Sequence, residues 1–180
     1  MSLLPRRSAS VSIDLTDVNI LVGALRFAAP QAVDRGMRRG MRAATIDVAG
    51  RVKELINGEV LNRRTGRLWK SIQPEVAERL GRVIGIVGTD VKYAAIHEFG
   101  GIIRPRSESG RLAFRIGDDF VMTSQVEMPR RPFMSRAATE RTPQIKRLLA
   151  KYVMQEVRGA VTTDNVLPVG QRKAVGFSGD

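Results

Sequence analysis

Residues 30–58, PQAVDRGMRRGMRAATIDVAGRVKELING, form the stretch that decides the fold of this chain. Its apolar side chains recur at spacings of four and three, which is typical of one buried face of an α-helix. These apolar positions are Val33, Met37, Met41, Ala44, Val48, Val52 and Leu55. Pro30 suits the first turn of such a helix, and Asn57-Gly58 suits its end. We therefore expect one long amphipathic helix that packs against a core.

Arginine side chains flank this apolar stripe without belonging to it. They are Arg35, Arg38, Arg39 and Arg42. Two interpretations stay open: a solvated flank of the helix, or a surface that faces a partner protein or DNA. The net charge of the whole chain, +12 at pH 7, favours contacts with polyanions. Because arginine binds carboxylates as readily as phosphates, the charge alone does not distinguish DNA from an acidic neighbouring subunit.

Shorter elements are expected on both sides of the long helix. Residues 11–15 alternate between apolar and polar and predict a strand, and residues 17–27 predict a short helix. After the long helix, residues 69–78 and 82–89 predict a hairpin that turns at Leu80-Gly81. The second of these two strands is rich in β-branched residues, so we expect it to be buried.

A short helix is expected after this hairpin. Asp90 would cap it, and Gly100-Gly101 would end it. Its apolar residues are Tyr93, Ile96 and Phe99, and we expect these three side chains to pack against the sheet.

A second hairpin is predicted from residues 102–116 and 120–128, with its turn at residues 117–119. Residues 104–110 within its first arm are too polar and too interrupted to continue a strand. We therefore expect a mobile loop at that position.

The C-terminal part begins with a stiff connector, Pro129-Arg130-Arg131-Pro132. A last helix follows from Phe133, and Thr142-Pro143 within it indicates either a kink or a new helix start. The order of elements predicts the α+β class, with an antiparallel sheet built from hairpins and with the long N-terminal helix and a C-terminal helix packed on it. We expect residues 1–160 to form a single domain and residues 161–180 to form an extended tail.

The composition excludes several classes of function. The chain has no cysteine, so it has no disulfide, thiolate metal site or cysteine nucleophile. No apolar run approaches the ~20 residues of a membrane span, and the N-terminus lacks the apolar stretch of a signal peptide. We therefore expect a soluble protein that is made in a cytoplasm and has no membrane partner.

The sequence offers little for catalysis. His97 is the only histidine, and its neighbour Glu98 would be its orienting carboxylate if it were a general base. Adjacent helical residues point about 100° apart, so these two side chains do not face each other. Asp118-Asp119 is typical of a turn rather than of a cation site. We therefore expect no enzymatic activity, no cofactor and no metal.

Three separated segments carry a more specific signal: RTGRLWKSI at residues 64–72, VGTDVKYAAIHEFGG at residues 87–101, and MPRRPFM at residues 128–134. In this order and spacing they resemble the virion-morphogenesis and tail-component proteins of long-tailed phages, which are variously called tail completion, minor tail or neck proteins. The resemblance covers roughly residues 33–154. The residues that carry it are Thr65, Gly66, Arg67, Leu68, Tyr93, His97, Glu98, Phe99, Gly100, Gly101, Pro129, Arg131, Pro132 and Phe133.

The resemblance implies a structural protein that works by assembly in the neck or tail of the virion, after synthesis in the cytoplasm of the bacterial host. It implies a ring, expected to be a hexamer, at the head-proximal end of the tail, where it helps tails to join filled heads. Its expected partners are further copies of itself, the head connector or stopper, and the tail terminator or tail-tube proteins. The alternative is a basic nucleic-acid-binding protein that contacts the genome without sequence specificity. Either function would use the candidate interface residues Arg35, Arg38, Arg39, Arg42, Arg104 and Arg106.

Overall fold

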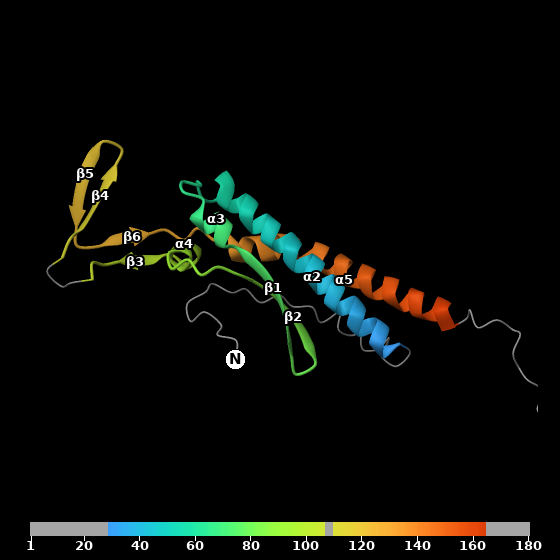
Figure 1. Cartoon of the computed structure of the whole chain (residues 1–180). Helices are drawn as coiled ribbons and strands as arrows, with labels where there is room; N and C mark the ends of the chain where they lie inside the picture. Colours follow the sequence, from blue (N-terminus) through green and yellow to red (C-terminus); the bar gives the residue numbers. More distant parts are fainter. Residues whose placement is uncertain (1–28, 107–109, 165–180) are drawn as a thin grey trace, which may run out of the picture.

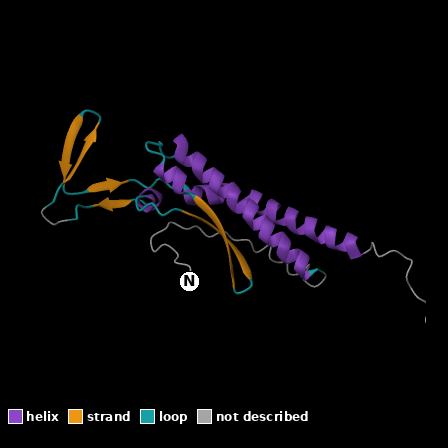
Figure 2. Ribbon diagram, in the orientation of Figure 1, coloured by secondary structure: helices purple, strands orange, loops and turns teal. Residues whose placement is uncertain are grey.

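The computed structural model describes residues 29–106 and 110–164. The strand predicted at residues 11–15 and the helix predicted at residues 17–27 lie outside the described residues. Two long helices run side by side and form the body, and a narrow arm of strands projects from one end of it (Figures 1 and 2).

The long helix predicted from the apolar stripe is α2 (Pro30–Glu54), and Pro30 occupies its first turn as expected. Every member of the stripe is buried, with at most 8% of its surface exposed. The helix continues into a single π-helical turn, η1 (Leu55–Glu59), where Gly58 adopts a φ of 129° and ends it. The prediction of this helix from its 3.6-residue periodicity is therefore confirmed.

Helix α5 (Met134–Asp164) lies against α2 over most of its length (Figure 1). The two backbones approach closely at Gly36, where a Cβ would lie 2.6 Å from the Cα of Val153. A Cβ at Gly40, one turn further along, would lie 3.1 Å from the Cα of Leu149. Small residues at these two positions therefore let the helices touch backbone to backbone, while Leu149 and Val153 fill the core between them.

Helix α5 bears on two predictions. It continues without interruption through Pro143, so no new helix starts there. The hydroxyl of Thr142 donates a hydrogen bond of 2.9 Å to the carbonyl oxygen of Ala138, as threonine often does within a helix. The helix also reaches Asp164, so the first four residues of the predicted tail are helical, and residues 165–180 lie outside the described residues.

The first predicted hairpin is formed by β1 (Gln73–Arg79) and β2 (Arg82–Gly88), and it packs along α2. Leu80 and Gly81 make the turn with φ values of 50° and 71°. The first strand begins four residues later than predicted, because Arg67–Ser71 forms a short helix, α3, that buries Leu68.

Only one face of this hairpin is covered, which corrects the prediction that its second strand is buried. Gly85 faces α2 so closely that a Cβ there would lie 2.4 Å from the hydroxyl of Thr45. The neighbouring residue Ile84 points to the opposite face and is 38% exposed. The hairpin therefore has an inner face on α2 and an uncovered outer face.

The second predicted hairpin forms the projecting arm, and it is built from two ladders. Next to the body, β3 (Gly101–Ile103) pairs with β6 (Val126–Met128). Towards the tip, β4 (Leu112–Ile116) pairs with β5 (Asp119–Thr123). The interruption between β3 and β4 was predicted from the polar sequence there, and residues 107–109 within it lie outside the described residues.

The α+β class is confirmed, with a long helix near the N-terminus, antiparallel hairpins and a long C-terminal helix. The described strands form three separate two-stranded ladders rather than one continuous sheet. Because only the β1–β2 ladder packs on α2, the core is mainly a contact between two helices, and the arm lies outside it.

Candidate assembly site

The short helix α4 (Ala94–Phe99) lies at the base of the arm, and its buried face is not the one predicted. Tyr93 and Phe99 were expected to pack against a sheet, but they are 41% and 59% exposed. The buried residues of this helix are Ala94 and Glu98. No side chain caps the helix start, so the predicted cap by Asp90 is wrong. The helix therefore presents aromatic side chains to solvent and buries a carboxylate.

Glu98 is completely buried, and its carboxylate caps the N-terminus of α5. One oxygen, Oε2, accepts hydrogen bonds of 2.8 Å from the backbone N–H groups of both Phe133 and Met134. The other oxygen, Oε1, accepts from the backbone N–H and the hydroxyl of Ser135, at 2.9 and 2.6 Å. Four donors and the positive end of the helix dipole compensate the buried charge. We call this arrangement the Glu98 clasp.

The backbone around the clasp joins the two ends of the arm. Arg131 donates its backbone N–H to the carbonyl oxygen of His97 at 2.7 Å. Gly100 adopts a φ of 71°, and a Cβ there would lie 3.1 Å from both the backbone nitrogen of Arg130 and the carbonyl oxygen of Met128. The two arm strands therefore leave the body through a tight passage that only glycine fits on one side.

The clasp brings two of the three sequence segments into contact. Residues 87–101 supply α4 and Glu98, and residues 128–134 supply the helix end that Glu98 caps. The segment at residues 64–72 joins them through Ser71, whose hydroxyl lies 2.6 Å from that of Thr89. Leu68 and Phe133 are buried, with exposures of 7% and 0%. All three segments thus build the base from which the arm projects.

His97 and Glu98 do not form an acid–base pair, as expected from their helical spacing. The Nδ1 atom of His97 has no hydrogen-bond partner, and its ring stacks edge-on against Tyr93 at a centroid distance of 6.0 Å. Burial and the nearby positive charge of Arg131 lower the pKa of His97. Among the described residues, no group of three histidine, aspartate or glutamate side chains could hold a metal ion.

The arginines flanking α2 mostly bind carboxylates of their own chain. Arg35 and Arg39 both pair with Glu156 of α5, and together they lower the pKa of its carboxyl group. Arg38 pairs with Glu78 of β1 through a 2.7 Å contact. These three predicted interface residues therefore also tie α2 to its neighbours within the subunit. The other predicted interface arginines, Arg42, Arg104 and Arg106, are exposed.

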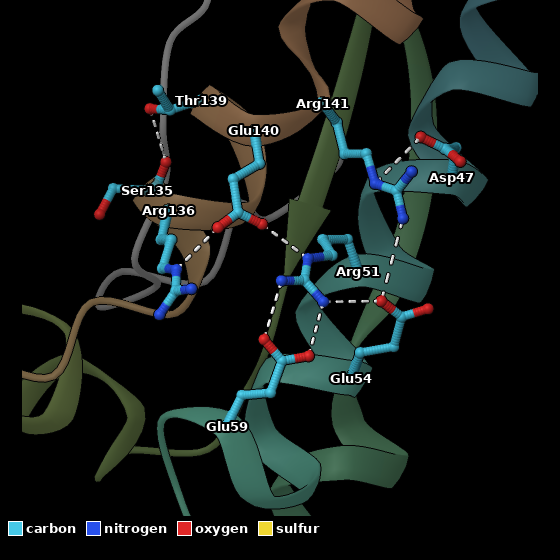
Figure 3. A network of polar contacts seen from close by, with 9 residues as sticks. All are labelled: Asp47, Arg51, Glu54, Glu59, Ser135, Arg136, Thr139, Glu140 and Arg141. Atoms are coloured by element: carbon cyan, nitrogen blue, oxygen red, sulfur yellow. Dashed lines mark hydrogen bonds and ion pairs between the residues drawn. The ribbon is translucent and has the colours of Figure 1, made fainter.

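A second ion-pair network, which was not predicted, joins α2, η1 and α5 (Figure 3). At its centre Arg51 contacts Glu54, Glu59 and Glu140 at 2.9, 2.7 and 2.6 Å. Arg136 also contacts Glu140, at 2.7 Å. These arginines lower the pKa of Glu140, and Arg51 lowers that of Glu59. The network fastens the end of the helix pair that lies nearest to the arm.

The arm itself exposes an unusual amount of apolar surface. The two ladders of the arm have no helix packed on them as the β1–β2 ladder has, so many of their apolar side chains stay in contact with water. The large apolar residues exposed at its base and along its strands are Phe99, Ile102, Ile103, Ile116, Phe120 and Met122, with exposures between 36% and 64%. Each ladder pairs only two strands, so both edges also remain open for further pairing. These features make the arm the candidate assembly site.

A two-helix body with a clasped, projecting arm defines an α+β protein. The chain belongs to the phage virion morphogenesis family, whose sequence model matches residues 41–157, more than half of the chain. It is therefore a virion-associated protein with a structural role in phage morphogenesis. No curated protein and no solved structure matches it. None of the helices in the described ranges is long and apolar enough to cross a membrane.

Proposed function

We propose that this protein is a tail-completion or head–tail joining component that assembles as a ring, with a hexamer expected, at the head-proximal end of the phage tail. Its partners are further copies of itself, the head connector or stopper, and the tail terminator or tail-tube proteins. It acts by shape and contact in the neck or tail of the virion and not as an enzyme. Membership of the phage virion morphogenesis family supports the structural role.

The exposed arm is the observation that carries this proposal. A rigid base sets its direction, since the Glu98 clasp and Gly100 hold both of its ends. Its apolar side chains are exposed and its strand edges are open, which suits contact with another protein. A ring repeats one such contact until it closes.

Contact with DNA is less well supported. Arg35, Arg38 and Arg39 engage carboxylates of their own chain, which reduces the positive potential they offer to phosphate groups. Retention of the purified protein on duplex DNA, with a steep dependence on salt, would favour this alternative.

Electron microscopy of a lysate made without this gene product tests the joining role. We expect DNA-filled heads and separate tails, because the remaining parts can form but cannot be connected. Supplying the protein in trans should restore joined particles. Normal tailed virions that lack the protein would refute the proposal, and empty heads without tails would move its role to an earlier step.

A further inference from the structure

A hollow lies on the outer face of the β1–β2 hairpin. It lies between α3 and the ladder and has a volume of about 640 Å³. Apolar groups of Ile86 and Val91 line it, and Arg67 and Lys70 contribute the basic side chains. Ile86 lies on the uncovered face, since the neighbouring Gly85 faces α2. Glu75 and Asp90 also line the hollow, so only its α3 side is basic, and that side suits an apolar group that carries negative charge.

The tip of the arm has this chemistry. Ile116 and Phe120 flank the turn and are 63% and 64% exposed. Between them lie Asp118 and Asp119, which are both exposed. The register pairs Ile116 with Asp119 and pairs Phe120 with Arg115, so one face of the tip combines an apolar side chain with a carboxylate and the other combines an aromatic ring with an arginine. The first of these faces needs a pocket that is apolar inside and basic at its rim.

Three other acidic groups are engaged within the subunit. Glu140 and Glu156 bind arginines of their own chain, and Glu98 caps α5. The hollow also contains Glu75 and Asp90, so the positive side chains that suit the tip are those contributed by α3. Because the basic side chains lie on the α3 side of the hollow, an acidic tip would enter with its carboxylates towards α3.

We propose that the tip of one copy's arm seats in the hollow of the next copy, with Ile116 on Ile86 and the two aspartates on Arg67 and Lys70. This rests on the proposed function, because it specifies the contact by which the ring closes. Ile116 and Asp119 are paired across the ladder and share one face of the tip. Figure 1 shows the β4–β5 tip pointing away from the β1–β2 ladder of its own subunit. The tip and the hollow thus form a head-to-tail contact between neighbouring copies, which is the kind that builds a ring.

Disulfide trapping tests the contact directly, because the chain contains no cysteine of its own. Full-length Ile116→Cys protein, which keeps both aspartates, is mixed with full-length Gln73→Cys protein of a different tag length. Gln73 lines the hollow. We expect a mixed disulfide dimer on oxidation. The matched control replaces Gln73→Cys with Arg79→Cys, which lies on the same strand and face at the end away from the hollow, and it should give no mixed dimer.

Charge reversal provides a second, independent test. Asp118→Arg with Asp119→Arg, or Arg67→Glu with Lys70→Glu, should each weaken self-association by roughly tenfold or more, because like charges then meet. The four changes combined in one chain should restore association. Arg79→Glu with Arg82→Glu serves as the control and should leave association unchanged. Circular dichroism should show all variants folded, since every substituted side chain is exposed.

The outcomes separate this inference from the joining role. If the wild type forms rings but gives no mixed dimer and no rescue, another segment occupies the hollow and the inference is wrong, while the joining role stands. A wild-type chain that stays monomeric in every mixture also overturns it. Tip-to-tip dimers formed by Ile116→Cys alone would indicate a symmetric contact and equally refute it. The joining role is judged separately, by microscopy of the lysate.

Discussion

The helix pair and the arm use the same kinds of side chain in opposite ways. In the helix pair, Val33, Val52 and Leu149 are at most 1% exposed, and glycines bring the two backbones together. In the arm, Ile116 and Phe120 are more than 60% exposed. Apolar side chains in the body therefore stabilise the subunit, whereas those in the arm gain their stabilisation only when another chain covers them.

The largest effect is expected from a charge placed in the helix pair. Val48 is 7% exposed in the middle of α2, and Val48→Asp would bury an unpaired carboxylate at a cost of about 4 kcal/mol or more. We expect unfolded or insoluble protein. Ile46→Asp is the matched control, because Ile46 on the same helix is 56% exposed and should tolerate the change. Thermal unfolding of both variants checks the prediction, and a Val48→Asp protein that melts like the wild type would contradict it.

The Glu98 clasp connects the two regions, and its loss should have the next largest effect. Glu98→Ala leaves the N–H groups of Phe133 and Met134 without acceptors in a buried place, so the free energy of unfolding should fall by about 2–4 kcal/mol. Glu127→Ala, on the exposed side of the arm, should change it little.

Chemical denaturation gives the free energy of unfolding of both variants, and amide hydrogen exchange shows which strands lose protection when the clasp is removed. Faster exchange in β3 and β6 of Glu98→Ala is expected, since the base of the arm loses its anchor. Equal stability of the two variants would mean that the clasp does not connect the regions.

Acid should weaken the ion pairs that tie the helix pair together. The carboxyl groups of Glu59, Glu140 and Glu156 have pKa values lowered from the ordinary 4.5 by their arginine partners. A lowered folded-state pKa gives stabilisation that is present above the unfolded value and lost as the pH falls through the folded value. Stability should therefore decline progressively below about pH 4.5. The loss should be modest because these pairs are solvent-accessible.

Denaturant titrations between pH 7 and pH 3 check this, with Glu140→Gln as the comparison. That variant should start less stable and lose less on acidification. An unchanged pH dependence in Glu140→Gln would show that the network in Figure 3 does not contribute.

The smallest effect on stability is expected at the tip of the arm. Phe120→Ala should change the free energy of unfolding by no more than about 0.5 kcal/mol, because the ring is already in water. Phe133→Ala, which removes a completely buried ring, should cost about 3–5 kcal/mol. Thermal unfolding compares the stability of the two variants, and analytical ultracentrifugation shows whether Phe120→Ala changes self-association. Similar losses of stability at both positions would mean that the arm belongs to the core.

The elements with a strong local signal were predictable. The apolar stripe of α2, the Leu80-Gly81 turn and the interruption of the arm are encoded in neighbouring residues. The candidate site was predicted only in part. Residues 87–101 and 128–134 were recognised as segments that carry the family resemblance. Tyr93 and Phe99, however, were predicted to be on the buried face of the short helix, and both are exposed. A helix of six residues has too few positions for its periodicity to identify the buried side.

The role of Glu98 could not be found from the sequence, because its hydrogen-bond partners lie 35 to 37 residues further along the chain. The ion pairs of Arg35, Arg39 and Arg51 were hidden for the same reason, since their acceptors in α5 lie far away in sequence. Nothing local to an arginine distinguishes a partner in its own subunit from one in another chain.

The sequence by itself determined the fold class and the apolar stripe of α2, because periodicity and turn chemistry act between residues a few positions apart. The family was indicated separately, by the resemblance of the three segments at residues 64–72, 87–101 and 128–134. Only the tertiary structure decided which carboxylate caps α5, which arginines are neutralised within the subunit, and that the second hairpin projects as an uncovered arm. Each of these features joins residues that are far apart in the sequence. Whether a side chain is buried, and whether its charge is compensated, therefore depends on the folded subunit and not on its neighbours in the chain.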